Sequence, residues 1–199
     1  MSEQPTSIIP GSSGSGFGDS PSPTRPTRRP LTWNPGTDLG LLLLRFGIGA
    51  VFFGHGAQKV FGLWGGIGID GFARALDSSG FNQSVTLSWV TGLTELIGGA
   101  FVVLGVLTPL AATGLLAVMI PTVIVNVGAG WFVGPGAAIN GVEYNVALGL
   151  AAAAIIFTGP GRIALDNGRT WHRRPAPWGV LALIIGVAAS LVVFFTFHR

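Results

Sequence analysis

The sequence has no cysteine and very little charge. Without thiols, the chain's own side chains cannot form a disulfide, a thiolate nucleophile, a cysteine-ligated zinc site or an iron–sulfur centre. Only 10% of its 199 residues are charged, whereas a soluble domain usually carries about 25%. The three histidines, His55, His172 and His198, are too far apart for a metal-ligand motif. These shortages disfavour a soluble enzyme, a secreted disulfide scaffold and a metal site.

Hydrophobic residues take the place of the missing charge. They make up 49% of the chain, and the mean hydropathy is +0.62. The net charge of +3 comes almost wholly from arginine, with Lys59 as the single lysine. Basic residues beside apolar stretches are typical of a membrane-topology signal, so nucleic acid is not an expected partner. The composition predicts a protein of the lipid bilayer.

Five apolar stretches approach the length of about 20 residues that a membrane-spanning helix needs. They run over residues 39–61, 86–107, 109–127, 142–158 and 178–197. This pattern predicts an all-α polytopic membrane helix bundle. Residues 39–166 contain the first four of these stretches, and residues 178–199 contain the fifth, an expected transmembrane helix at the C-terminal end of the pattern. Residues 1–38 are rich in Pro, Ser and Gly and predict a disordered tail, and residues 167–177 predict a basic loop.

The arginines predict the orientation. The tail carries Arg25, Arg28 and Arg29, and the connection between the fourth and fifth spans carries Arg162, Arg169, Arg173 and Arg174. With five spans these two segments fall on the same side, and basic segments stay in the cytoplasm. We therefore expect a bacterial inner-membrane protein with a cytoplasmic N-terminus and an external C-terminus. Asp166 and the arginines near it are expected in a solvated loop beside anionic lipid headgroups.

The connection between the first two spans has the pattern of an amphipathic helix. Ile69, Phe72, Ala73 and Leu76 share one helical face, which predicts a short helix at the membrane interface. Trp64 and Phe81 flank it as expected interfacial anchors. The alternative is a loop that packs over the bundle.

Ionisable residues inside the spans are costly and usually face protein. Arg45, His55 and Lys59 fall on one face of the first span, and Glu95 shares its face with glycines of the second. Depth arithmetic favours an ion pair between Glu95 and Arg45. A pair between Glu95 and His55, and a carboxylic acid kept neutral by burial, are the alternatives.

A second polar cluster is expected at the outer mouth of the bundle. Asn126 ends the third span, and the fourth begins with Glu143, Tyr144 and Asn145. Glu143 is expected to pair with Lys59 or His55, and the cluster to line a polar cavity. Each feature also has a structural interpretation: an ion pair that only stabilises the fold, a histidine that only packs, and residues that only cap a helix.

Four motifs resemble the DoxX family of small bacterial membrane proteins. The segment that carries them covers residues 39–166. In chain order they are Arg45 followed by His55-Gly56-x-x-Lys59, Glu95-x-x-Gly98-Gly99, Glu143-Tyr144-Asn145, and Gly159-Pro160-Gly161. The Arg-rich connection and the fifth span lie beyond the usual four-helix core of that family.

The resemblance implies a membrane subunit of an oxidoreductase system. Relatives are linked to a thiosulfate:quinone oxidoreductase and to assemblies that handle thiols and oxidative stress, so partner proteins of that kind are implied, and a homo-oligomer is a further option. The chain has no motif for a redox cofactor of its own. A bound quinone is the cofactor that the resemblance leaves open.

Three hypotheses follow. In the first, a subunit of an oxidoreductase binds quinone or a small sulfur species at a polar intramembrane site. His55 and Glu95 are its candidate catalytic residues, and its candidate binding residues are Arg45, Lys59, Asn126, Glu143, Tyr144 and Asn145. In the second, the chain is a non-catalytic membrane anchor that recruits soluble partners. In the third, it is a small proton-coupled transporter built around Glu95.

Overall fold

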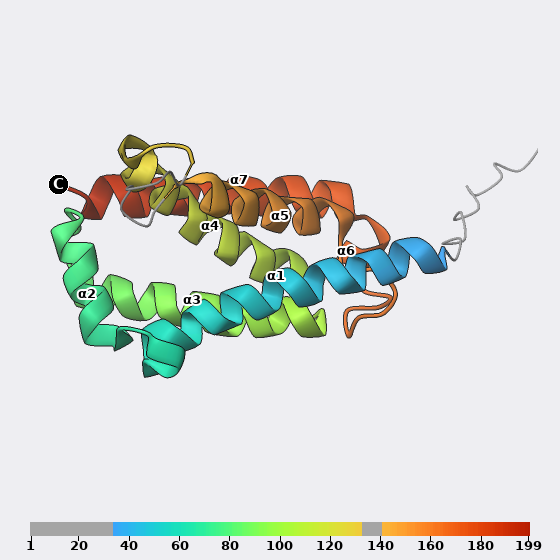
Figure 1. Cartoon of the computed structure of the whole chain (residues 1–199). Helices are drawn as coiled ribbons and strands as arrows, with labels where there is room; N and C mark the ends of the chain where they lie inside the picture. Colours follow the sequence, from blue (N-terminus) through green and yellow to red (C-terminus); the bar gives the residue numbers. More distant parts are fainter. Residues whose placement is uncertain (1–33, 133–140) are drawn as a thin grey trace, which may run out of the picture. The chain divides into compact units, whose positions relative to one another are not determined.

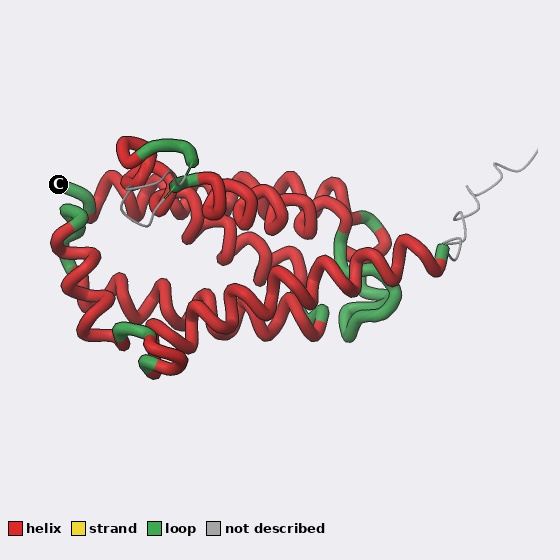
Figure 2. The backbone as a smooth tube through the Cα atoms, in the orientation of Figure 1, coloured by secondary structure: helices red, strands yellow, loops and turns green. Residues whose placement is uncertain are grey.

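The computed structural model describes residues 34–132 and 141–199, and nearly all of them are helical (Figures 1 and 2). The five longer helices are α1 (Pro35–Phe61), α3 (Ser84–Leu104), α4 (Thr108–Asn126), α5 (Glu143–Thr158) and α7 (Pro175–Phe197). The short ones are η1 (Leu63–Gly65), α2 (Gly68–Ser78), η2 (Val127–Ala129) and α6 (Thr170–Arg173). The described residues contain no strand beyond an isolated bridge between Phe81 and His198. The predicted all-α class is confirmed.

Four of these helices, α1, α3, α4 and α7, are long and apolar enough to cross a membrane. Helix α5 is shorter, with 16 residues, but it is also apolar and contributes to the core. The chain is therefore a polytopic membrane helix bundle, as predicted. Helix α1 begins earlier than expected, because Pro35 occupies its first turn and the Asn34 side chain accepts a hydrogen bond from the Thr37 amide (3.1 Å). Residues 35–38 of the predicted tail are thus helical, and residues 1–33 lie outside the described residues.

The five longer helices run alternately between two ends of the bundle (Figure 1). One end holds the start of α1, the turn between α3 and α4, and α6; we call it the α6 end. The other holds the end of α1, α2 and the C-terminus; we call it the α2 end. The predicted basic loop, residues 167–177, is partly helical in the structure. Helix α6 lies within it, and α7 already begins at Pro175.

Helices α1 and α3 pack closely because glycines remove the side chains between them. A Cβ on Gly49 would lie 2.6 Å from the carbonyl oxygen of Gly99, and one on Gly56 would lie 2.6 Å from the Leu96 Cα. Such small-residue contacts are the usual means of close helix approach in membranes. They set the register of α1 against α3.

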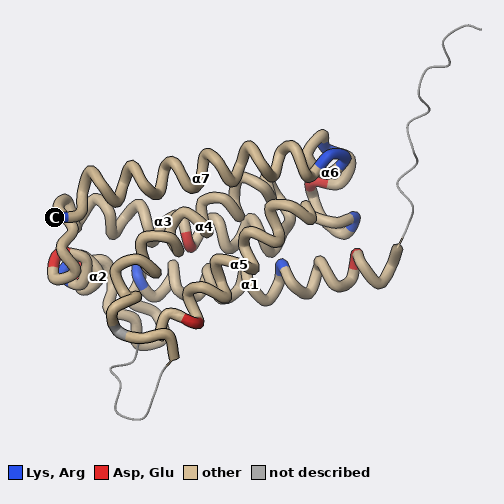
Figure 3. The backbone as a smooth tube through the Cα atoms, turned by 90° about the horizontal axis from the view of Figure 1, so that it is seen from above, with Lys and Arg blue, Asp and Glu red and all other residues tan. Residues whose placement is uncertain are grey.

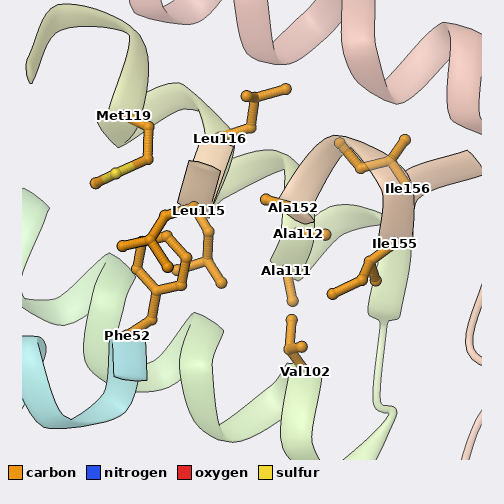
Figure 4. Close-up of a cluster of buried hydrophobic side chains, with 11 residues drawn as sticks. Phe52, Val102, Ala111, Ala112, Leu115, Leu116, Met119, Ala152, Ile155 and Ile156 are labelled. Atoms are coloured by element: carbon orange, nitrogen blue, oxygen red, sulfur yellow. The ribbon is translucent and has the colours of Figure 1, made fainter. Parts of the chain in front are cut away.

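The hydrophobic core lies where α1, α3, α4 and α5 meet (Figure 4). Phe52 of α1, Val102 of α3, Leu115 of α4 and Ile155 of α5 are all fully buried there. Helix α7 adds a layer outside α4 and α5, with Gly186 against Thr113 of α4 and Gly179 against the Ile156 carbonyl of α5.

Helix α2 confirms the predicted amphipathic helix. Ala73 is buried, whereas Asp70 and Arg74 are exposed. The expectation for Phe81 is wrong: its ring is buried and packs edge-on against Phe194 and His198 rather than serving as an anchor in lipid. The backbone bridge at Phe81 holds the end of α7 against the turn after α2, and the apolar ring lies under that joint.

Candidate functional site

The buried carboxylate of Glu95 pairs with Lys59. The Lys59 Nζ lies 2.5 Å from the Glu95 Oε2, and the two side chains are 20% and 3% exposed. The expected pairs of Glu95 with Arg45 or with His55 are therefore wrong. Both charges of the Lys59–Glu95 pair are compensated inside the apolar bundle, as burial of charge requires.

The error has a physical cause in the lengths of the helices. From the predicted spans, Glu95 was expected near mid-membrane, between the levels of Arg45 and His55. In the structure Gly92 lies opposite Val60, so the first two turns of α3 extend beyond the end of α1 and pack against α2. This offset brings Glu95 within reach of Lys59, and it leaves Arg45 near the opposite end of α3.

The Lys59 ammonium also lies over an aromatic ring. Its Nζ is 5.2 Å from the centre of the Phe72 ring on α2, within the range of a cation–π contact. Three elements that are separate in sequence thus converge here: α1 supplies Lys59, α3 supplies Glu95 and α2 supplies Phe72. We call these three residues the ion-pair site.

Arg45 lies apart from the ion-pair site, at the α6 end, and is fully buried. Its guanidinium donates hydrogen bonds to the carbonyls of Val102 (3.4 Å) and Val103 (3.5 Å) and to that of Ile163. Val102 and Val103 belong to the last turn of α3, where the helix dipole favours a cation. The Val102 carbonyl also accepts a hydrogen bond from the Gly105 amide (3.3 Å). Arg45 thus closes the end of α3 and holds the segment after α5 against it.

Asp166 is buried at the same end, so the expectation of a solvated Asp166 is wrong. It is 4% exposed, and it accepts hydrogen bonds from the amides of Leu107 (3.1 Å) and Thr108 (2.7 Å) and from the Thr108 hydroxyl (2.9 Å). Leu107 occupies the N-cap position of α4 and has no side chain that can cap. Asp166 therefore serves as the N-cap from a distant part of the chain.

Asp38 supports the same segment from α1. Its carboxylate is buried and accepts a hydrogen bond from the Arg162 amide (2.8 Å). Figure 3 shows how the basic residues gather around α6 at this end, while only a few charges mark the rest of the bundle. The two acids Asp38 and Asp166 are thus both engaged by backbone amides.

The predicted residues His55, Glu143, Tyr144 and Asn145 lie at the α2 end. The His55 ring meets Tyr144 edge-on, with centroids 6.2 Å apart. Tyr144 is half-exposed, and Glu143 and Asn145 are partly buried at the start of α5. Lys59 pairs with Glu95, and a pair of Glu143 with Lys59 or His55 stays a prediction.

A cavity of about 340 Å³ lies between α2, α3, α4 and α7, next to the ion-pair site. Phe72 belongs to its wall, so one ring borders both the cavity and the Lys59 ammonium. Thr91 and Thr94, which flank Glu95 on α3, line it as well. Asn126 is the predicted site residue that reaches the cavity, and its side-chain amide donates to the Thr122 carbonyl (2.7 Å).

Two polar groups of the cavity wall lack ordinary partners. Ser190 of α7 is 3% exposed, and its Oγ has no hydrogen-bond partner among the described residues. Pro121 lies inside α4 and has no amide hydrogen, so the Ala117 carbonyl cannot form its usual helical bond to residue 121. Both Ala117 and Pro121 line the cavity with Ser190. A donor and an acceptor therefore border a mostly apolar space.

Neither Phe72 nor Ser190 was predicted as a site residue. Phe72 was placed on the apolar face of its helix, with no reason to link it to Lys59. A signal for Ser190 is present, since Gly179, Gly186 and Ser190 form a stripe of small residues that are all buried. Such a stripe marks the face by which a membrane helix packs on its neighbours. Among the described residues, no three His, Asp or Glu side chains group closely enough to hold a metal ion.

Comparison with known proteins points to one family. Residues 40–129, from α1 to η2, match the family model DoxX. The motifs at residues 143–145 and 159–161 lie beyond the matched segment. No curated protein and no solved structure matches the chain. The matched segment contains the whole ion-pair site, and the match supports membership of the chain in the DoxX family.

Proposed function

We propose that this protein is a membrane subunit of an oxidoreductase system and that it binds a quinone in the cavity beside the ion-pair site. The observation that carries the proposal is the shared wall: Phe72 borders both the cavity and the Lys59 ammonium. A bound quinone takes up two electrons and two protons when it is reduced to the quinol. The sequence has no thiol and no cofactor-attachment motif, so a partner protein would exchange the electrons.

The cavity suits a quinone in size, polarity and access. Its volume of about 340 Å³ falls at the lower end of the range for small-molecule sites, about 300–1,000 Å³. No charged residue lines it, which favours a neutral ring. The Ser190 hydroxyl can donate a hydrogen bond to a quinone carbonyl, and the Ala117 carbonyl can accept one from the reduced form. Phe72 offers an aromatic face to the ring.

A small sulfur oxyanion suits the site less well. Lys59 is already paired with Glu95, and the buried Arg45 already bonds carbonyls at the other end of the bundle. An anion would have to displace Glu95 from Lys59, and the displaced carboxylate would then remain in the apolar interior without a partner. The neutral ligand requires no such exchange. The role of Glu95 in this proposal is to hold Lys59 beneath Phe72.

The test measures binding of decylubiquinone, a quinone with a short tail, to the purified full chain in mild detergent. Calorimetry gives the dissociation constant of the wild type and of Ser190→Ala and Phe72→Leu. We expect the Ser190 change to weaken binding about fivefold, the value of one neutral hydrogen bond, and the Phe72 change to weaken it at least as much.

Matched controls separate the cavity from general effects on the bundle. Thr196→Ala removes a hydroxyl from an exposed position of α7, and Phe61→Leu shortens an exposed ring of α1. Both should bind like the wild type. A wild type that binds no quinone overturns the proposal, as does equal weakening in the controls. Binding that is lost in His55→Ala but kept in Ser190→Ala would move the site to the His55–Tyr144 contact and would also overturn it.

A further inference from the structure

A separate apolar slot opens at the α6 end, between the first turns of α4 and the first turns of α7. Its volume is about 230 Å³, and its walls include Leu110 of α4 with Leu181 and Ile185 of α7. No charged residue lines it. The hydroxyl of Thr113, also in the wall, already donates to the Pro109 carbonyl (2.6 Å). The slot therefore suits hydrocarbon.

Two tryptophans border the slot where the chain leaves the spans. The rings of Trp171 and Trp178 meet edge-on with centroids 6.4 Å apart, and both line the slot. The Trp171 Nε1 is buried and has no hydrogen-bond partner among the described residues. Tryptophan at the end of a membrane helix is typical of the headgroup level of a bilayer. An acceptor oxygen at the headgroup level would satisfy this unpaired Nε1–H.

Positive charge surrounds the same tryptophans. Arg169 and Arg173 lie on either side of Trp171 in the chain, and Arg174 precedes the first residue of α7. Arg169 and Arg174 are exposed, and their side chains make no hydrogen bond or ion pair within residues 34–132 and 141–199. The acids of this end, Asp38 and Asp166, are buried and hydrogen-bonded to amides. The charge facing the surface at this point is therefore basic.

We propose that the slot and its rim bind an anionic phospholipid. One acyl chain lies between Leu110 and Leu181, and the Trp171 Nε1 donates to an oxygen of the glycerol ester or the phosphate. Arg169 and Arg174 lie beside the phosphate. Each basic residue near an anionic headgroup contributes favourably to binding. This site is at the opposite end of the bundle from the proposed quinone cavity and does not depend on it.

The test compares binding of phosphatidylglycerol and phosphatidylcholine to the delipidated full chain by native mass spectrometry. We expect phosphatidylglycerol to bind more tightly. The double variant Arg169→Gln with Arg174→Gln should reduce that preference about tenfold, and Trp171→Phe should weaken binding of phosphatidylglycerol. Arg169→Lys with Arg174→Lys should keep the preference, because it keeps the charge.

The control is Arg74→Gln, which removes an exposed arginine from α2 at the other end of the bundle. It should leave the lipid preference unchanged. Excess inorganic phosphate should not displace the lipid, since the acyl chain supplies part of the binding. Equal binding of the two lipids, an equal loss in Arg74→Gln, or displacement by phosphate alone would each overturn the proposal. Unchanged thermal unfolding of the Gln double variant confirms that it is folded.

Discussion

The bundle buries charge in two places and neutralises it in two different ways. At the α6 end, Arg45 and Asp166 are held by backbone groups: carbonyls surround the arginine, and amides with a hydroxyl surround the aspartate. Toward the α2 end, Lys59 and Glu95 neutralise one another through their side chains. Backbone partners are fixed by the fold, whereas a side-chain pair can separate. The backbone-held charges of Arg45 and Asp166 are therefore suited to a structural role. The Lys59–Glu95 pair can change its partners and is therefore better suited to a functional one.

The comparison predicts that Arg45→Met has the largest effect on stability. The change removes the guanidinium donor from the carbonyls of Val103 and Ile163 and leaves the Val102 carbonyl with the Gly105 amide alone. Loss of a charged donor to several partly or fully buried carbonyls is costly. We expect the free energy of unfolding to fall by about 3 kcal/mol or more, measured by unfolding in detergent. Arg74→Met, on the exposed face of α2, is the control and should change it by less than about 0.5 kcal/mol. Similar losses in the two variants would contradict a structural role for Arg45.

The ion-pair site should behave as a coupled unit. Glu95→Gln leaves a buried ammonium without its counter-charge, and Lys59→Met leaves a buried carboxylate. We expect each single variant to lose about 2 kcal/mol of stability, less than Arg45→Met because Lys59 retains some contact with solvent. The double variant should lose less than the sum of the two, and a double-mutant cycle measures this coupling. Additive losses would show that the two side chains do not depend on one another.

Asp166→Ala tests the cap at the start of α4. It removes the acceptor for the Leu107 and Thr108 amides, and loss of an N-cap typically costs about 1 kcal/mol, with a range of about 0.5–2. Asp166→Asn keeps an acceptor oxygen and should lose less. Asp70→Ala, on the exposed face of α2, is the matched control. If Asp70→Ala were as damaging as Asp166→Ala, the contrast between backbone-held and solvent-facing acids would fail.

Hydropathy and helical spacing were enough to predict the fold. A long apolar run predicts a membrane helix however the helices are arranged in space. The common helical face of Ile69, Phe72 and Ala73 predicts the amphipathic α2. Helix limits were less accurate, because a cap such as Asn34 with Pro35 adds turns outside the apolar run. Phe81 is buried because its backbone forms a bridge with His198 near the end of the chain. No local sequence pattern predicts such a long-range contact.

The site was also predicted only in part, because it depends on contacts between residues far apart in the chain. Helical spacing correctly turned Lys59 and Glu95 toward protein, but it cannot give the relative height of two helices. That height depends on the glycine contacts of Gly49 and Gly56 and on the space that α2 fills. The cap by Asp166 joins residues 58 apart in the chain. An apolar residue at the N-cap position, Leu107, was the one sign that a distant acceptor was needed.

His172 offers the smallest test at the α6 end, because its ring also takes part in backbone bonding. Its Nδ1 accepts a hydrogen bond from the Gly168 amide (3.0 Å), which only a ring with an unprotonated Nδ1 can do. Partial burial lowers the pKa of His172 below its ordinary value of 6.5. Asp38 and Asp166 oppose this shift, whereas Arg162 and Arg173 reinforce it.

The sign of the pH effect follows from this lowered pKa. As the pH falls through 6.5, the unfolded chain takes up the proton before the folded one does, so the folded state loses stability. We expect a decrease of about 2 °C in unfolding temperature between about pH 7 and pH 5 from this residue, as for the loss of one neutral hydrogen bond. His172→Gln cannot titrate and should show a shallower pH dependence than the wild type. If the two profiles have the same slope, the Gly168–His172 bond does not contribute to the stability of the α6 end, and the backbone-held network there is limited to Arg45, Asp38 and Asp166.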